Sequence, residues 1–222
     1  MTVGDKILDF YKDLTPPKGL SKNVTILNPY IDEDACALIT KFYNQYYNDQ
    51  NERTILFGIN PGRFGGGLTG VPFTDPVHME SVCGIKNDLD KRAELSSSFV
   101  YEVINACGGA KAFFSRYYIS SVSPLGFMQD GKNLNYYDIK GYKKLFFNYA
   151  KDQIIKQLDL PTNRQIAYSI GKGTNIKFLH ELNKEFGFFD SIEPVPHPRW
   201  VMQYRLKRKM EFIQEYKDKL GF

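Results

Sequence analysis

Four short runs of apolar and β-branched residues, separated by longer stretches of helical character, constrain the fold of this chain most strongly. The runs cover residues 54–59, 117–121, 165–170 and 191–195. The first, TILFGI, is almost wholly apolar, which is typical of a central strand covered on both faces. Strands that alternate with helices predict a layered α/β fold around a mainly parallel sheet. With 222 residues and no internal repeat or linker, we expect a single domain over residues 1–222.

Apolar residues recur at helical spacing in further segments, namely residues 32–48, 98–107, 147–158, 174–186 and 205–220. Asp32 is placed to cap the first segment, and Gly108 follows the second as a stop signal. The last segment has one apolar stripe that we expect to face the core, formed by Leu206, Met210, Ile213 and Leu220. The basic residues 207–209 lie largely off this stripe, and we interpret them as a solvated face rather than as a phosphate contact.

Charge and cysteine content exclude little by themselves. The formal net charge is +4, a mildly basic balance that suits an anionic partner but does not require one. The three cysteines are widely spaced and include no Cys-x-x-Cys pair, so we expect reduced thiols rather than a disulfide framework or a zinc site. We find no signal peptide and no apolar run approaching the roughly 18 residues that span a bilayer. We therefore expect a soluble intracellular protein without a membrane partner.

A glycine-rich segment after the first predicted strand has the G-x-G-x-x-G spacing of a dinucleotide-binding loop, at Gly65, Gly67 and Gly70. In such a loop the first glycine follows the strand directly and the last one opens a helix. Here four residues, PGRF, separate Asn60 from the first glycine, and Pro72 and Pro76 disfavour a helix that starts at Gly70. A dinucleotide oxidoreductase and a loop without ligand remain open alternatives. We favour glycines that let the backbone approach a flat ligand.

Two residues near strand ends are candidates for chemistry. Ligands collect at the carboxyl ends of parallel strands, where Asn60, the segment SVSPLGF and the segment PHPRW are expected to converge. The amide of Asn60 has the acceptor needed to hold a water, and His197, in a stiff loop between two prolines, can donate to a developing anion. We place His78 in a loop and His180 on a helix, without a function for either. Asp75 is the only acid expected near the glycine-rich segment, and no cluster has metal-ligand spacing.

Three segments together resemble the uracil-DNA glycosylase superfamily, most closely a divergent bacterial subgroup of its single-strand-selective monofunctional (SMUG-type) branch. The segment GINPGRFGGGLTGVPF is similar to that branch's Gly-Met-Asn-Pro-Gly-x-Phe-Gly-Met-x-x-Thr-Gly-Val-Pro-Phe. The segment SPLGFMQDGKNL resembles the family's Cys-Pro-Leu-x-Phe followed by Gly-Arg-Asn-Leu, and HPRW resembles the opening of His-Pro-Ser-Pro-Arg. The resemblance covers roughly residues 54 to 205, most of the chain.

The resemblance implies a three-layer α/β/α fold with a four-stranded sheet, and a monofunctional DNA glycosylase that removes uracil without cofactor or metal. By analogy, Asn60 positions the attacking water, Phe73 stacks on the flipped base and His197 bonds to uracil O2. The implied substrate-binding set is Ile59, Gly62, Phe64, Gly70, Phe73 and Ser121. Pro198, Arg199 and Trp200 are the candidates for the wedge that fills the gap left by the base. DNA is the implied partner of a monomer, in the cytoplasm of a bacterium or the nucleus of a eukaryote.

The chain departs from the family at two places, at Ser121 and in the wedge segment. Ser121 stands where the family reads the uracil edge with an Asn, so Ser120, Ser123, backbone amides or a bridging water are further candidates for this contact. Gly62 suggests an open pocket wall where some uracil-selective relatives place a Tyr that rejects the thymine methyl, and this extends the candidate substrates to modified pyrimidines and xanthine. The wedge segment is shortened to HPRW. A relative that binds damaged DNA without catalysis is the other alternative.

Overall fold

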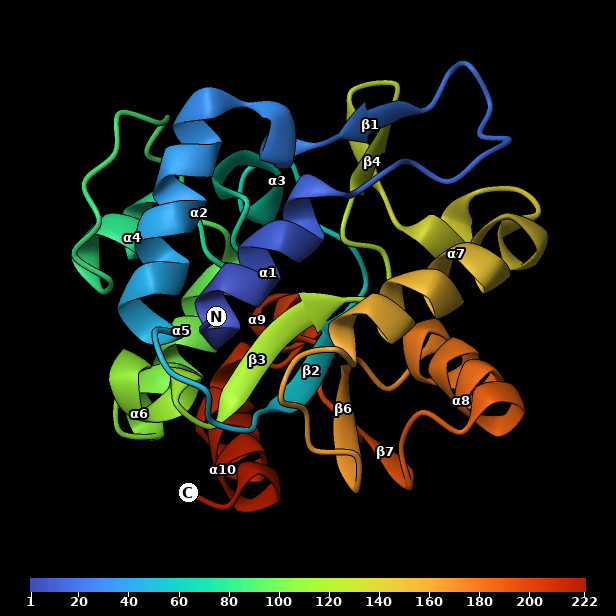
Figure 1. The fold of residues 1–222 in the computed structure, drawn as a ribbon. Coiled ribbons are helices and arrows are strands. Elements are labelled where there is room, and N and C mark those ends of the chain that lie inside the picture. The colour runs from blue at the N-terminus through green and yellow to red at the C-terminus, as the bar shows by residue number, and fades with distance from the viewer.

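Four parallel strands form the central sheet in the computed structural model, which describes residues 1–222 (Figure 1). They are β2 (Thr54–Gly58), β3 (Tyr117–Ser121), β6 (Ile166–Ile170) and β7 (Ser191–Val195), in the order β3-β2-β6-β7. The four predicted strands are therefore confirmed to within a residue at either end. Parallel pairing aligns Gly58 with Ser121, so the two strands end at the same edge of the sheet.

Helices cover both faces of this sheet, as predicted for an α/β/α fold. Helix α1 packs on α2 and α7 on one side, whereas α5, α9 and α10 pack on one another on the other side, behind the sheet in Figure 1. The helices are α1 (Val3–Lys12), α2 (Glu33–Tyr46), α3 (Gly66–Thr69), α4 (Pro76–Ser81), α5 (Leu95–Ala106), α6 (Ala110–Phe114), α7 (Tyr142–Gln157), α8 (Thr174–Phe186), α9 (Pro198–Tyr204) and α10 (Lys209–Leu220). Three short 3-10 turns are η1 (Pro29–Ile31), η2 (Tyr136–Asp138) and η3 (Leu206–Arg208).

The predicted helices are present, with some changed ends. Asp32 caps α2 by accepting the backbone N–H of Ala35 at 2.9 Å, and α8 has the predicted bounds. Helices α5 and α7 begin at Leu95 and Tyr142, several residues before the predicted starts. The first turn of α5 is largely serine and carries no apolar periodicity, whereas in α7 the helical spacing of Tyr142, Leu145 and Phe146 was missed. His78 lies in helix α4, so its placement in a loop was wrong: Pro76 occupies the first turn of this helix, where its missing N–H is tolerated.

The predicted helix over residues 205–220 is interrupted. Helix α9 ends at Tyr204, η3 redirects the chain, and α10 begins only at Lys209. The apolar stripe is correct for its second half, which is buried, but Leu206 and Met210 are 57% and 69% exposed. Leu206 lies in η3, before the start of α10, so it does not share a face with Ile213 and Leu220. Met210 lies in the first turn of α10, before its first buried residue, Ile213.

A second sheet was not predicted. Strands β1 (Thr25–Leu27), β4 (Gly126–Gln129) and β5 (Lys132–Leu134) form a small antiparallel sheet in the order β1-β4-β5. Asp130 and Gly131 connect β4 to β5 with positive φ angles of 49° and 70°, as expected of an Asp-Gly hairpin turn. These strands are only three or four residues long, too short for a clear period-2 pattern. The hairpin matters because it carries β5 to the carboxyl end of β2.

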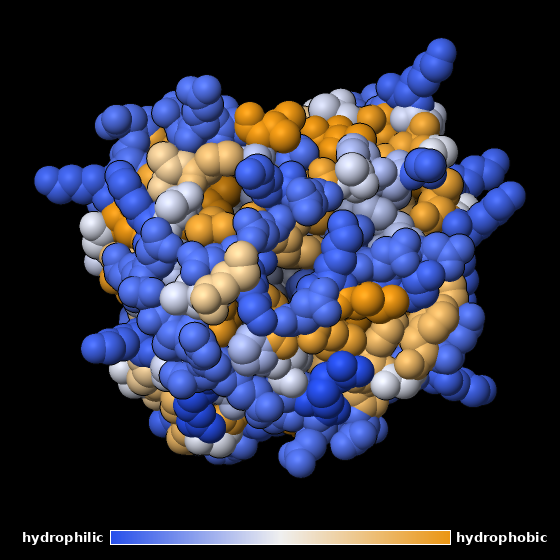
Figure 2. Space-filling model, viewed as in Figure 1, coloured by the Kyte–Doolittle hydropathy of each residue, from blue (hydrophilic) through white to orange (hydrophobic).

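One continuous hydrophobic core holds the layers together, with members from Val3 near the first residue to Leu220 near the last. Central strand β2 supplies Ile55, Leu56 and Phe57, which are at most 1% exposed, as predicted for a strand covered on both faces. The surface in Figure 2 is mainly hydrophilic, with apolar atoms between polar side chains. None of the helices combines the length and the apolar character that a membrane span requires.

Candidate active site

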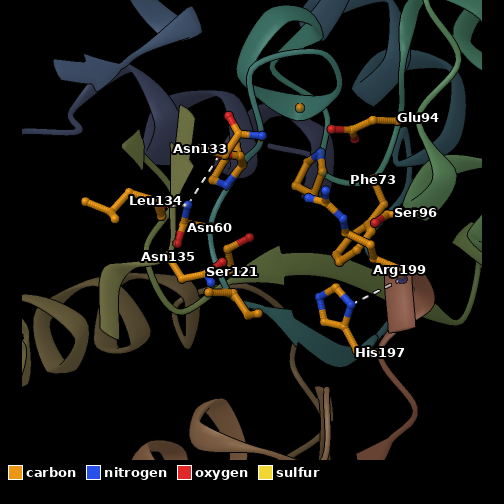
Figure 3. A pocket seen from close by; sticks show the side chains of 15 residues that line it. Asn60, Phe73, Glu94, Ser96, Ser121, Asn133, Leu134, Asn135, His197 and Arg199 are labelled. Atoms are coloured by element: carbon orange, nitrogen blue, oxygen red, sulfur yellow. Dashed lines mark hydrogen bonds between the residues drawn. The ribbon is translucent and has the colours of Figure 1, made fainter. Parts of the chain in front are cut away.

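A cavity of about 110 Å³ opens where the carboxyl ends of β2, β3 and β7 meet (Figure 3). It is lined by Ile59, Asn60, Pro61, Gly62, Gly66, Pro72, Phe73, Glu94, Ser96, Ser121, Asn133, Leu134, Asn135, His197 and Arg199. The three segments expected to converge after the strands do so. Pockets that bury drug-sized ligands typically measure roughly 300 Å³ or more. This cavity is therefore suited to a single heterocyclic base and is small for a dinucleotide cofactor.

Asn60 is held in one orientation by the backbone that follows β5. Its Nδ2 donates to the carbonyl of Leu134 at 3.1 Å, and its Oδ1 accepts the N–H of Tyr136 at 2.9 Å. These two partners fix which end of the amide is oxygen, because a carbonyl requires a donor and an N–H requires an acceptor. A carbonyl oxygen has two lone pairs, so Oδ1 keeps one for a ligand or a water.

The segment that clamps Asn60 is itself anchored to the central sheet. The Tyr136 hydroxyl donates to Oδ1 of Asn175 at 3.1 Å, and Nδ2 of Asn175 donates to the carbonyl of Phe57 at 3.2 Å. Tyr136 and Asn175 are 0% and 2% exposed. The hydrogen bonds thus form a closed path from β2 through α8 and η2 back to Asn60, which restricts its side-chain motion.

His197 is the N-cap of helix α9, and this role fixes its tautomer. Its Nδ1 accepts the backbone N–H of Arg199 at 3.2 Å. Burial and, second, the charge of Arg199 lower the pKa of His197 to about 4. The ring is therefore neutral at pH 7, with its proton on Nε2. A neutral imidazole held in this way presents one N–H donor to the cavity.

Phe73 has an unusual backbone conformation, with φ at +53°. Its ring lies against the end of β2: a Cβ on Gly58 would be 2.8 Å from Cε2 of Phe73. Glycine at position 58 therefore allows the ring to pack on the strand and to form one wall of the cavity. Non-glycine residues with positive φ are costly and often occur at functional sites, where the surrounding structure imposes them.

Ser121 lies at the end of β3, at the floor of the cavity, and is 3% exposed. Its hydroxyl forms no hydrogen bond within the protein and remains available to a ligand. The other two serines considered for the same contact differ. Ser123 donates its hydroxyl to the carbonyl of Leu125 at 2.9 Å, whereas the buried Ser120 hydroxyl has no partner and does not line the cavity. Of the three, only Ser121 reaches the cavity.

The wall at Gly62 is not open, which corrects the interpretation from the sequence. The carboxyl of Glu94 occupies the adjacent space, and a Cβ on Gly62 would lie 2.9 Å from its Oε1. Burial, and then the charge of Asp75, raise the pKa of Glu94, while Arg199 acts in the opposite direction. An acid from a distant segment therefore fills the volume that the glycine leaves. Asp75 is thus not the only acid near the glycine-rich segment.

Asp75 positions the segment that carries Glu94. It is fully buried, caps α4 by accepting the N–H of His78 at 2.8 Å, and accepts the N–H of Glu94 at 2.8 Å. Its carboxylate also contacts Nδ1 of His78 at 2.9 Å. Burial raises the pKa of Asp75, but the hydrogen bonds from His78 and Glu94 outweigh burial and lower it overall. Asp75 therefore has a supporting role behind the cavity wall.

The remaining residues predicted for substrate or DNA contact lie outside the cavity lining. Gly70 ends helix α3 with φ at +73°, and a Cβ there would overlap the side chain of Ile39. Pro198 is the buried first residue of α9. Trp200 is 40% exposed and packs edge-on against Phe212, with ring centroids 5.5 Å apart.

Phe64 also lies outside the cavity, between two cations. The guanidinium groups of Arg63 and Arg92 lie 4.5 Å and 3.9 Å from the centroid of its ring. Arg199 differs from the other wedge candidates, because it lines the cavity, and Figure 3 shows its side chain beside Phe73 and Ser96.

Several cavity residues were missed from the sequence, namely Glu94, Ser96, Asn133, Leu134 and Asn135. Asn133 and Leu134 belong to the segment GKNL, which already carried part of the resemblance and was the one available signal. Glu94 and Ser96 lie in the polar stretch KRAELSSS, which has no recognisable motif. Their segment is held at the cavity by the hydrogen bond that the backbone N–H of Glu94 donates to Asp75. This is a tertiary contact that no sequence pattern indicates.

The structure contains no group of three or more His, Cys, Asp or Glu side chains that could hold a metal ion. Cys36, Cys83 and Cys107 are free thiols in the structure. The glycine-rich segment forms the short helix α3, which ends at Gly70 rather than beginning there. This is the reverse of a dinucleotide-binding loop, in which the last glycine opens the helix.

Residues 45–221 match the sequence model of the uracil DNA glycosylase superfamily. Among solved structures, that of wild-type SMUG2 from Pedobacter heparinus is similar to this chain, with a TM-score of 0.96 and 40% sequence identity. The match covers 100% of this chain and 97% of that chain, so it includes every segment that lines the cavity. The expected fold and the resemblance to the SMUG-type branch are confirmed.

Proposed function

Because the chain belongs to the uracil DNA glycosylase superfamily, we propose that its cavity receives a uracil flipped out of DNA and that Asn60 and His197 promote its hydrolytic removal. The protein is a uracil-DNA glycosylase, a hydrolase that acts on N-glycosidic bonds in DNA. Such an enzyme extrudes its target nucleotide, since the bond is out of reach within the base stack. The assignment of individual residues rests on the geometry of the cavity.

In the proposed reaction, the C–N bond between deoxyribose and uracil breaks and its electron pair leaves with the base. The negative charge that develops on uracil O2 accepts a hydrogen bond from Nε2–H of His197. Asn60 Oδ1 holds a water that attacks the anomeric carbon. The proton that this water loses as the new C–O bond forms passes to solvent, and solvent protonates the departing uracil anion. The products are free uracil and an abasic sugar. One preorganised donor of this kind is worth roughly 3 to 4 kcal/mol of transition-state stabilisation.

The proposal rests on the fixed orientations of the Asn60 amide and the His197 ring. The hydrogen bond that Asn60 donates to Leu134 and the one that it accepts from Tyr136 leave a lone pair of Oδ1 free. The hydrogen bond that His197 accepts from Arg199 leaves its Nε2–H free. Both side chains line the same cavity (Figure 3). One group thus offers an acceptor for water and the other a donor for an anion. Preorganised groups of this type stabilise charge without reorganisation during the reaction.

Other side chains are proposed to bind the base. Phe73 stacks on its face, Ser121 contacts its edge, and Ile59 and Gly62 complete the wall. Arg199, at the cavity mouth, is the favoured candidate to enter the gap in the stack. Trp200 is exposed and remains a second candidate. Because Glu94 fills the space beside Gly62, we propose that the enzyme prefers uracil, with xanthine and modified pyrimidines as substrates to be tested.

The direct test incubates the protein with an oligonucleotide that contains a single uracil. Release of free uracil, together with strand breakage that requires alkali or heat, is expected for a monofunctional glycosylase. No lysine lines the cavity, so breakage without such treatment would contradict this assignment. Tight binding of the uracil strand without release of base would instead favour the alternative of a non-catalytic damage-binding protein.

We also propose that residues 1–222 act as a single domain and as a monomer on DNA. The single continuous core supports the first statement. Sedimentation of the protein with and without a uracil-containing strand tests the second, with one protein per strand as the expected result. A bacterial cytoplasmic location, on the nucleoid, is the proposal that follows from a DNA substrate.

A further inference from the structure

A second cavity, of about 450 Å³, opens beside the base cavity and shares part of its wall. Glu94, Ser96, Asn133 and Arg199 line both cavities, so the two are contiguous. We call the second cavity the cationic trough, because its remaining lining includes Arg63, Phe64, Arg92 and Lys132. A ligand that extends out of the base cavity on the Glu94 side enters the trough directly.

Four cationic side chains surround the trough, namely Arg63, Arg92, Lys132 and Arg199. None of them takes part in any of the ion pairs of the protein, which join other cations to carboxylates. The only carboxylate in the lining is that of Glu94, at the boundary with the base cavity. Unpaired positive charges that converge on a concave surface attract an anion, and phosphate is the anion that DNA supplies.

The trough also contains a surface for stacking. The Phe64 ring is flanked by the guanidinium groups of Arg63 and Arg92, and it remains partly exposed. Nucleobases stack on aromatic rings and on guanidinium planes without regard to sequence. Two hydrogen bonds hold Arg63 in place. Its guanidinium donates to the carbonyl of Gly131, and its backbone N–H donates to Oδ1 of Asn133 at 3.1 Å. Cations and a stacking surface together suit a nucleotide better than a free anion.

We propose that the cationic trough is a second nucleotide subsite, which binds the phosphodiester and the base next to the flipped nucleotide on one side of the lesion. This inference rests on the proposed function, because it assumes that the base cavity holds the uracil. The contacts come from one strand only, so the subsite contributes equally in single-stranded and in paired DNA. The nucleotide on the opposite side of the lesion does not use it.

The test compares very short single-stranded substrates. Deoxyuridine is supplied with one flanking nucleotide on its 5′ side, on its 3′ side, or on both, and kcat and KM for uracil release are measured. In the wild type, we expect each flank to increase kcat/KM. In the variant Arg92→Ala/Lys132→Ala, one of the two gains is expected to fall by about tenfold, mainly through KM, while the gain from the other flank persists.

Further variants separate the two contacts in the trough. A flanking abasic residue keeps the phosphate but lacks the base, so it is expected to lower the gain in the wild type and to have no additional effect in Phe64→Ala. In Arg92→Ala/Lys132→Ala, the slope of the logarithm of the DNA-binding constant against the logarithm of salt concentration is expected to become shallower by roughly 0.7 for each phosphate contact that is lost. Lys184→Ala is the matched control, because Lys184 is an exposed cation in the last turn of α8, at the opposite end of the sheet.

The proposal is overturned if both flanks retain their full gains in Arg92→Ala/Lys132→Ala, or if both gains fall equally, as loss of a general electrostatic attraction would cause. Thermal unfolding confirms that the variants fold; both replaced side chains are exposed. Failure of the subsite is distinguishable from failure of the proposed function. In the first case the variants still release uracil with unaltered flank dependence, whereas in the second the wild type itself releases none.

Discussion

Nδ1 of His197 accepts a hydrogen bond from the backbone N–H of Arg199 at 3.2 Å, and the same Arg199 places its charge near the imidazole. The hydrogen bond requires an unprotonated Nδ1, and the charge disfavours a cationic ring. Both effects act in the same direction as burial. His197 is thus a neutral donor through Nε2, and an acidic transition of the enzyme near the usual histidine pKa is not expected.

We predict that the ring of His197 titrates near pH 4, the value to which burial and Arg199 lower its pKa. Because the pKa is lowered on folding, the unfolded chain binds more protons between about pH 4 and 6.5, and stability rises with pH across this window. Nuclear magnetic resonance of the histidine ring carbons measures the transition. Arg199→Ala is expected to raise its midpoint, and a wild-type midpoint near 6.5 would contradict the prediction.

Replacing Gly58 with alanine is predicted to displace the Phe73 ring. The new Cβ would lie 2.8 Å from Cε2 of that ring, closer than van der Waals contact allows. Overpacking of this kind costs about 1 to 3 kcal/mol of unfolding free energy. Uracil excision is expected to fall as well, since Phe73 forms a wall of the cavity. Gly173→Ala is the control, because a Cβ there meets no other atom. Unchanged denaturation and activity of Gly58→Ala would show that the ring adapts freely.

Gly70 was predicted from the sequence to bind substrate, but its position indicates a structural role. Gly70→Ala places a Cβ in the side chain of Ile39 and imposes a φ of +73° on alanine. We expect a loss of about 2 to 4 kcal/mol in unfolding free energy from strain and overlap together. Chemical denaturation measures this loss. A variant with wild-type stability and selectively weakened binding of uracil DNA would restore the substrate-binding interpretation.

Removing the Glu94 side chain is predicted to widen the substrate range. Its carboxyl fills the space beside Gly62, and Glu94→Ala opens that wall. We expect the ratio of thymine to uracil excision to increase by about tenfold, within the range of 10 to 200 that one methyl-sized difference supplies. Glu94→Gln keeps the volume and serves as the control. Equal ratios for wild type and Glu94→Ala in a competition assay would exclude Glu94 from selectivity.

Sequence patterns predicted the framework of this protein well, because the buried strands and the amphipathic helices are determined by local periodicity. Asn60 and His197 were placed correctly at strand ends, since parallel strands bring their carboxyl ends to one edge. The resemblance to a family supplied their chemistry, which periodicity alone leaves open. Strands β4 and β5 were missed because each is too short to display a period.

The shape of the cavity wall could not be predicted from the sequence. Gly62 suggested an empty space, and only the fold shows that Glu94 fills it. The two residues are brought together by the hydrogen bond that Asp75 accepts from the backbone of Glu94. Likewise, the role of Leu134 and Tyr136 in orienting Asn60 depends on backbone atoms, which have no signature in the sequence. Tertiary hydrogen bonds of this kind decide the shape of the site.

The central claim is that Asn60 positions the water and His197 stabilises the leaving uracil. Single-turnover rates of uracil release, for wild type, Asn60→Ala, His197→Ala and the double variant, test it most directly. We predict that each single variant loses about a hundredfold to a thousandfold in rate. Each variant is expected to unfold at a somewhat lower temperature, because Asn60→Ala loses the hydrogen bonds to Leu134 and from Tyr136 and His197→Ala loses the cap of α9, but to remain folded in the assay and to bind DNA about as tightly as the wild type. Full activity in both single variants, or absence of uracil release by the wild type, would contradict the claim.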